Sequence, residues 1–299
     1  MSRPLVIYHA GCRDGWAAAF VAHAYYHGAA DFFAAYYGQE PPPVTHGQRV
    51  FLLDFCYKRD VLVALAKRCD LAVLDHHKTA QADVDGLSRH LLEVVFDMDR
   101  SGAGIAWDYF YGGDKHDGFV LGRPIGDVLR PWWVNYVEDR DLWRWALPDS
   151  RLVNAYLGAL PFTFDGWREG VSISLDQAKT MGRAIDQKVG QYVAEVSKNA
   201  AWGFVYDTTG ASLFGEAVPI VNVPQCDVSE VLEFLMSEHD VDSAVAWWQR
   251  ADGLFQYSLR STERSRLDVS ALAKRCGGGG HRQAAGFQTP QLVHARNGR

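Results

Sequence analysis

The sequence predicts an α/β fold, with an N-terminal domain built on a parallel sheet, a connector helix and a smaller α/β C-terminal domain. In the first half of the chain, short apolar runs alternate with helical stretches, as in β-α-β units. A long amphipathic stretch without strand signals follows, and strand-like segments return after it. A length of 299 residues also favours about two domains, each with its own core.

Four apolar runs in the first half are expected to form the parallel strands. They are PLVIYH (4–9), VFLLDF (50–55), LAVLDHH (71–77) and LLEVVFDMD (91–99). Helices are expected in WAAAFVAHAYYH (16–27), KRDVLVALAKR (58–68) and SGAGIAWDYFY (101–111). Because each strand run ends with acidic or histidine residues, polar side chains should gather at one edge of the sheet, where open α/β folds place their ligands.

The second half is expected to hold the connector and the smaller domain. Apolar residues recur every three or four positions from 175 to 198, which indicates an amphipathic helix. We therefore expect domains at 1–170 and 200–299, with the connector helix in 171–199. The C-terminal strands are expected in 201–207, 217–223, 243–250 and 254–261, and a helix in 226–239.

Composition limits the function classes. A net charge of −6 disfavours a protein that coats long duplex DNA, whereas short anionic ligands stay open. The five cysteines are scattered without a C-x-x-C pair, which argues against a disulfide framework and fits a reducing cytoplasm. No apolar run has the length of a signal sequence or a membrane span, so we expect a cytoplasmic protein without membrane contact. The sequence leaves the oligomeric state open.

Carboxylates and imidazoles follow three of the predicted strands. Carboxylates gathered at one sheet edge repel each other and need a cation. Oxygen ligands mixed with imidazole suit Mn²⁺, Fe²⁺ or Mg²⁺, and two such ions about 4 Å apart would form a phosphoryl-transfer site. The alternative is that these are ordinary polar residues leaving the core. The residues are His9, Asp14, Asp54, Asp75, His76 and His77.

A glycine run near the C-terminus is the second candidate site. GGGGHRQAAG (277–286) offers backbone N–H groups to an anion, and a helix beginning after it would add its dipole. Basic residues outnumber acidic ones in 255–283, and Arg260 lies on a predicted strand there. A phosphate cradle is therefore one interpretation, and a flexible loop is the other.

These motifs, in this order, resemble the DHH (Asp-His-His) phosphoesterases that carry a DHH-associated C-terminal domain. HAGCRDG resembles the first family motif, LLDF the second, and LDHH is the signature itself. FDMDRSGAGIAW and YVEDRDLW resemble later motifs of the catalytic domain. YSLRS and GGGGHRQAAGF resemble the substrate-binding motifs of the associated domain, which implies substrate contacts at Arg260, Ser261, Gly278, Gly279, Gly280 and His281.

The resemblance implies two metal positions that share Asp54. His9 and Asp54 would hold one ion, and the other would be held by Asp14, Asp54, His76 and an Asp of the EDRD segment. The motif does not separate Asp139 from Asp141, and we favour Asp139. His77 would contact the substrate or transition state, and Asp75 would orient it or act as a distant ligand.

Cys12 departs from the family pattern, because it stands where the first motif has a carboxylate. A thiolate is a softer ligand, so the first metal position would favour Fe or Zn, bind weakly or be empty. Alternatively, Cys12 is a small apolar filler.

The resemblance further implies in-line attack on phosphorus by a hydroxide that the metal activates. The expected cofactor is one or two Mn²⁺ ions, with Mg²⁺, Fe²⁺ or Zn²⁺ as alternatives. The glycine-rich motif favours short oligonucleotide or (di)nucleotide substrates. Two other hypotheses stay open, a polyphosphate or pyrophosphate hydrolase and a nucleotide-binding module with impaired catalysis.

Overall fold

The structure is a computed structural model that describes residues 2–87, 92–112, 119–120, 123–124, 129–224 and 228–296. The chain divides into two compact units, Met1–Asp186 and Gln187–Arg299. The division falls within helix α8 (Leu175–Ser197), which lies in the segment where the sequence predicts a connector helix.

Five parallel strands form the sheet of the first unit, which confirms the predicted fold class. Their order is β2-β1-β3-β4-β5, so β1, β3 and β4 are direct neighbours. Four of them overlap the predicted segments, with β3 and β4 beginning one residue earlier than predicted, and Leu91 of the fourth segment is outside the described residues. The strands are β1 (Leu5–His9), β2 (Asp31–Ala35), β3 (Arg49–Leu53), β4 (Asp70–Asp75) and β5 (Leu92–Phe96).

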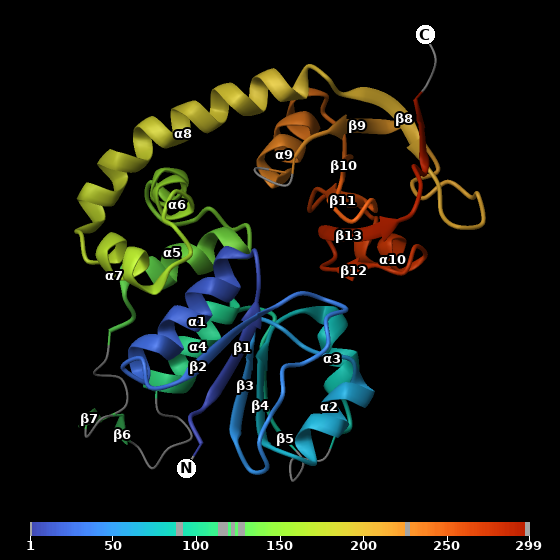
Figure 1. The fold of residues 1–299 in the computed structure, drawn as a ribbon. Helices are drawn as coiled ribbons and strands as arrows, with labels where there is room; N and C mark the ends of the chain where they lie inside the picture. The colour runs from blue at the N-terminus through green and yellow to red at the C-terminus, as the bar shows by residue number, and fades with distance from the viewer. Residues whose placement is uncertain are drawn as a thin grey trace. The chain divides into compact units, whose positions relative to one another are not determined.

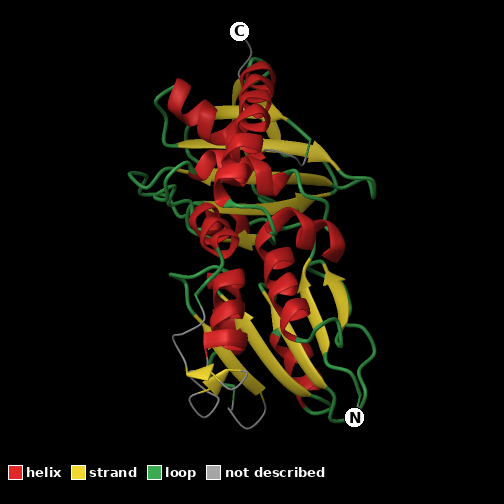
Figure 2. Cartoon of the chain, turned by 90° about the vertical axis from the view of Figure 1, so that its left-hand side faces the viewer, coloured by secondary structure: helices red, strands yellow, loops and turns green. Residues whose placement is uncertain are grey.

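Helices cover both faces of this sheet (Figures 1 and 2). Val6 and Tyr8 of β1 belong to the core that α1 and α4 build on one face, whereas Leu5 and Ile7 belong to the core with α2 on the other. Since both faces are buried, the strands read as continuous apolar runs rather than alternating ones. The carboxyl ends of the strands are left to carry polar side chains.

The three helices predicted for the first unit are present with different lengths, whereas α3, α5, α6 and α7 were not predicted. The predicted helix at 101–111 is a short α-helix that continues as a π-helix. A two-stranded ribbon, β6 (Phe119–Val120) and β7 (Arg123–Pro124), follows it. The helices are α1 (Arg13–Tyr25), α2 (Arg59–Ala66), α3 (Lys78–Val84), α4 (Gly102–Trp107), η1 (Asp108–Gly112), α5 (Trp132–Asp141), α6 (Ser150–Gly158) and α7 (Phe164–Val171).

The second unit holds a mixed sheet of seven strands in the order β12-β13-β11-β10-β9-β8-β14. Helices α9 (Val228–Glu238) and α10 (Val269–Lys274) pack on it. The predicted helix of this unit begins at residue 226, and residues 226 and 227 lie outside the described part. The strands are β8 (Ala201–Val205), β9 (Val218–Asn222), β10 (Ser243–Gln249), β11 (Phe255–Ser261), β12 (Gly279–Gly280), β13 (Ala284–Thr289) and β14 (His294–Arg296).

Among the helices that the structure describes, none combines the length and the apolar content needed to cross a bilayer.

Candidate metal centre

The carboxyl ends of β1, β3 and β4 bring the predicted polar residues of the first unit together. His9 is the last residue of β1, Asp54 follows β3, and Asp75 ends β4 directly before His76 and His77. The backbone N–H of Asp54 still donates to the Leu74 carbonyl oxygen at 2.9 Å, but its φ is 52°. This left-handed backbone is uncommon outside glycine, asparagine and aspartate, and it turns the side chain at the strand end.

Three carboxylates surround the His76 imidazole. Its Nε2 lies 3.1 Å from Asp54 Oδ1, 3.5 Å from Asp141 Oδ2 and 3.7 Å from Asp14 Oδ2. Asp14 comes from the first turn of α1, and Asp141 is the last residue of α5. Asp14, Asp54 and His76 are each no more than 2% exposed, and Asp141 is partly buried. These groups form a buried set of one nitrogen and three carboxylate ligands.

His9, Cys12 and Asp54 form a second set on the other side of the same carboxylate. One ligand atom from each lies within 4.8 Å of the others. His9 Nδ1 and Asp54 Oδ2 are 3.6 Å apart, and both are buried atoms without a hydrogen-bond partner among the described residues. Two atoms that each lie about 2.1 Å from one ion are roughly 3 to 4 Å apart. The donors present therefore fit a cation between His9 and Asp54.

The charges of the first set also fit a cation. The pKa of His76 is raised to about 10, because hydrogen bonding to Asp54 and the nearby carboxylates outweigh burial, which acts in the opposite direction. The hydrogen bond to His76 and the neighbouring imidazoles of His9 and His77 hold the pKa of Asp54 below its ordinary value despite burial. Burial, followed by the neighbouring carboxylates, raises the pKa of Asp14 well above its ordinary value. A single imidazolium leaves the carboxylates under-compensated, whereas a divalent ion would balance them.

Asp75 is arranged to orient His77. Asp75 Oδ1 accepts from the backbone N–H groups of His76 and His77 at 2.7 and 3.1 Å, and it lies 2.7 Å from His77 Nδ1. Asp75 is completely buried. The carboxylate fixes the ring orientation of His77, and its charge outweighs burial to raise the pKa of that imidazole.

The geometry favours Asp141 over Asp139, against the preference stated from the sequence. Asp139 Oδ2 accepts from Ser150 Oγ at 2.5 Å, and Asp139 Oδ1 accepts from the Ala146 N–H at 2.9 Å. Its oxygens therefore stabilise the turn after α5, whereas Asp141 lies at His76. Two residues apart on a helix of 3.6 residues per turn, the two side chains leave the axis in nearly opposite directions.

Two glycines that the sequence analysis gave no role let the pieces of the centre approach each other. A Cβ on Gly15 would lie 2.5 Å from the His9 carbonyl oxygen, and one on Gly102 would lie 2.5 Å from Asp54 Cβ. The Gly102 N–H donates to Asp14 Oδ2 at 2.5 Å, and the Ala103 N–H donates to Asp14 Oδ1 at 2.9 Å. The start of α4 thus holds the Asp14 carboxylate in place.

In the second unit, Arg260 and Ser261 end strand β11. The Arg260 guanidinium donates to Ser229 Oγ at 2.6 Å, and Ser261 is buried. Arg260 pairs with Ala284 of β13, and the His281 N–H donates to the Ala284 carbonyl oxygen at 2.7 Å. The structure therefore brings Arg260 close to the end of the glycine run, as the predicted cradle requires.

The expectation of a helix after the glycine run is wrong. Gly279 and Gly280 form β12, and the small residues after His281 form β13. A Cβ on Gly278 would lie 2.1 Å from the Gly286 carbonyl oxygen, and Gly280 has a φ of 138°. Close approach of two strands accounts for these glycines, and α10 precedes the run instead of following it.

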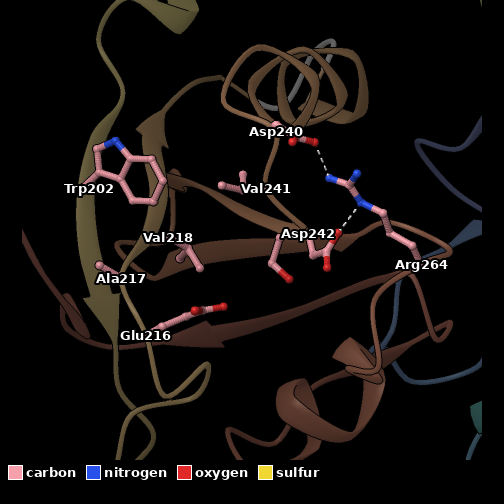
Figure 3. Close-up of a pocket in the computed structure, with 9 residues that line it drawn as sticks. Trp202, Glu216, Ala217, Val218, Asp240, Val241, Asp242 and Arg264 are labelled. Carbon is pink, nitrogen blue, oxygen red and sulfur yellow. Dashed lines mark hydrogen bonds and ion pairs between the residues drawn. The ribbon is translucent and has the colours of Figure 1, made fainter.

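Part of the basic charge near the C-terminus is locally compensated. Arg264 donates to Asp240 and Asp242 at 2.7 and 2.5 Å, at a cavity of about 520 Å³ (Figure 3). Arg275 pairs with Asp207. None of the predicted site residues lines that cavity, so it is separate from the sites described above.

Comparison with known proteins gives one relative by sequence and several by structure. No protein-family model matches the chain. Over 309 residues it is 27% identical to an uncharacterized protein, R106, of Acanthamoeba polyphaga mimivirus, covering 95% of this chain. The chain spans 66% of the length of that relative, which is less than two thirds.

Three solved structures are similar across nearly the whole chain. RecJ from Thermus thermophilus in complex with Mn²⁺ is 12% identical with a TM-score of 0.49, over 95% of this chain and 49% of RecJ. The pGpG-specific phosphodiesterase PggH of Vibrio cholerae is 14% identical with a TM-score of 0.48, over 96% and 93%. The DHH domain of a member of the s1p family of ribosomal proteins is 10% identical with a TM-score of 0.53, over 95% and 82%. The chain has the fold of the DHH superfamily.

Proposed function

We propose that the protein is a metal-dependent phosphoester hydrolase that acts on short oligonucleotides or (di)nucleotides. The observation that carries this proposal is the position of Asp54 between two ligand sets. Its Oδ1 faces His76 at 3.1 Å and its Oδ2 faces His9 at 3.6 Å. A carboxylate shared between two cation positions is the arrangement that two-metal hydrolases use to clamp a phosphoryl group.

His9, Cys12 and Asp54 would hold one ion, and Asp14, Asp54, His76 and Asp141 would hold the other. Carboxylate and imidazole donors suit Mn²⁺, with Mg²⁺, Fe²⁺ and Zn²⁺ as alternatives. The ions would activate water and neutralise the charge that develops on the phosphoryl oxygens.

The protein residues around these positions would bind and orient the substrate. Asp75 accepts from His77 Nδ1 and raises the pKa of that imidazole, so the protonated ring keeps one orientation in which Nε2–H can donate to a phosphoryl oxygen. In the second unit, Arg260 and His281 would bind a phosphate group, although Arg260 first has to exchange its hydrogen bond to Ser229.

The replacement of a carboxylate by Cys12 supports a second candidate, a nucleotide-binding module with impaired catalysis. Burial, followed by the charges of Asp54 and its neighbours, raises the pKa of the Cys12 thiol well above its ordinary value. Without a cation the thiol therefore stays protonated, and a protonated thiol is a poor ligand.

A hydrolysis panel with Mn²⁺ separates these functions. It contains short RNA and DNA oligomers, linear and cyclic dinucleotides, a nucleoside bisphosphate, pyrophosphate and polyphosphate. We expect turnover of dinucleotides or short oligomers and none of the phosphate polymers. Tight nucleotide binding without turnover would favour the binding module, and release of phosphate from the polymers alone would favour a polyphosphate or pyrophosphate hydrolase.

Asp54→Asn is the matched active-site variant for the same panel, and Asp97→Asn is its control. Asp97 directly follows β5, as Asp54 follows β3, but its carboxylate accepts from the backbone N–H of Asp99. Asp54→Asn should abolish turnover and Asp97→Asn should retain it.

A further inference from the structure

An exposed tyrosine borders the candidate metal centre and has no role in the proposed chemistry. Tyr37 follows β2, a strand that the sequence analysis did not predict. Its ring centroid lies 5.1 Å from that of His9 and 6.4 Å from that of His77. The residue is nevertheless 55% exposed. Part of this residue is thus open to solvent beside two imidazoles of the site, while burial and the charges of Asp75 and Asp54 raise the pKa of its hydroxyl well above the ordinary value.

One face of the Tyr37 ring packs against a buried aromatic residue. It stacks on Phe55 with centroids 5.2 Å apart and an interplanar angle of 30°. Phe55 is 1% exposed and follows Asp54 directly, and its ring packs edge-on against Tyr57. Because one face of Tyr37 rests on this fixed neighbour, its exposed surface has a defined position relative to Asp54.

Hydrogen bonding within the turn supports the backbone that carries Tyr37. The Tyr36 N–H donates to Gln39 Oε1 at 3.1 Å, and Gly38 takes a φ of 85° in the turn between them. A ring that is already ordered loses little conformational entropy when a ligand stacks on it.

We propose that Tyr37 positions the substrate by stacking on the nucleobase next to the phosphate that is held at the metal centre. The inference rests on the proposed function and deepens it. Every nucleobase has a flat face, so a single tyrosine would favour nucleotides over ring-free phosphates without selecting one base. Tyr37 would act on substrate binding, and the ligands of the metal ions would be unaffected by its removal.

The test compares the binding of AMP and ribose 5-phosphate, two ligands that differ by the base alone. Each ligand is titrated into the full chain in the presence of Mn²⁺, and isothermal titration calorimetry gives the ratio of the two dissociation constants. We expect AMP to bind roughly tenfold or more tightly in the wild type, which is the size of one base–aromatic contact. Tyr37→Leu should bring the ratio to about one, with Mn²⁺ affinity unchanged, and Tyr37→Phe should keep the wild-type ratio.

Tyr36→Leu is the matched control. Tyr36 is the adjacent residue and 59% exposed, and no ring contact joins it to His9 or His77 among the described residues. It should keep the wild-type ratio. An equal ratio in Tyr37→Leu and the wild type, or no preference for AMP in the wild type, would overturn the proposal. Because the test measures binding, it shows whether Tyr37 stacks on the base even if the hydrolysis panel detects no turnover.

Discussion

Among the single residues, His76 carries the proton that a cation would have to displace. In the metal-free protein it keeps a proton at neutral pH, since its pKa is raised to about 10 chiefly by hydrogen bonding to Asp54. The raised pKa lies above the ordinary value of about 6.5. Protonated His76 therefore stabilises the folded state. This stabilisation is complete below pH 6.5 and is lost as the pH rises through 10.

Metal binding should therefore release a proton. We predict that binding of Mn²⁺ at pH 7 releases about one proton or more, and that the apparent affinity rises about tenfold per pH unit for each proton released. Isothermal titration in two buffers with different ionisation enthalpies measures this number. His76→Gln should reduce it by about one, and an equal heat in both buffers for the wild type would contradict the role of His76.

Asp139 and Asp141 differ in function although they are two residues apart. We predict that Asp139→Asn lowers the free energy of unfolding by about 1 to 3 kcal/mol, because its carboxylate oxygens accept from Ser150 and the turn after α5. Asp141→Asn should instead weaken Mn²⁺ binding and leave metal-free stability nearly unchanged or higher, since it removes one of three crowded carboxylates. Urea unfolding and Mn²⁺ titration measure both effects, and the reverse pattern would restore Asp139 as the ligand.

Spectroscopy can test whether the Cys12 sulfur is a metal ligand. If its sulfur is a ligand, the Co²⁺ complex should show a near-ultraviolet thiolate-to-cobalt charge-transfer band that disappears in Cys12→Ser. Cys56→Ser is the control, because Cys56 is buried and its thiol donates to the Tyr57 carbonyl oxygen. A spectrum of wild-type intensity in Cys12→Ser would show that Cys12 is a small apolar filler.

At the scale of elements, the centre depends on how closely helix α1 approaches the end of β1. We predict that Gly15→Ala lowers the free energy of unfolding by about 1 to 3 kcal/mol, because the new methyl group would meet the His9 carbonyl oxygen. Gly190→Ala, in α8 with nothing within 4 Å of the added atom, should raise it by about 0.5 to 1 kcal/mol. Chemical unfolding of both variants measures the difference, and a stabilised Gly15→Ala would contradict the packing.

The sequence predicts elements well where a buried strand gives a continuous apolar run. The strands before His9, Asp54 and His76 are found for that reason. Strand β2 (Asp31–Ala35) is missed, because it lies at the sheet edge and only its last residue is buried. Tyr37 is missed with it, since nothing in its local sequence shows that β2 pairs with β1 and brings the ring to His9.

Other errors arise because local signals do not determine tertiary partners. The glycine run suggests an anion loop before a helix, but its glycines serve the approach of β12 to β13. The EDRD segment contains two aspartates, and only the direction of α5 separates Asp141 from Asp139. Gly102 likewise has no visible role until α4 is placed against Asp14.

At the scale of the whole molecule, a chain with net charge −6 carries several carboxylates where the proposed substrate brings further negative charge. On the proposed function, we therefore expect a cation to bind before a phosphate approaches the residues around Asp54. The DHH-type fold sets the strand ends that supply these residues, and it does not by itself determine the reaction.

Titration of the full chain with Mn²⁺, monitored through the electron paramagnetic resonance signal of the free ion, measures directly whether Asp54 is needed to hold the metal. We predict saturable binding to the wild type and to Asp97→Asn. Asp54→Asn should keep the circular dichroism spectrum of the wild type and lose the bound ions. Binding of Mn²⁺ to Asp54→Asn with wild-type affinity would contradict the central claim that Asp54 holds the metal centre together.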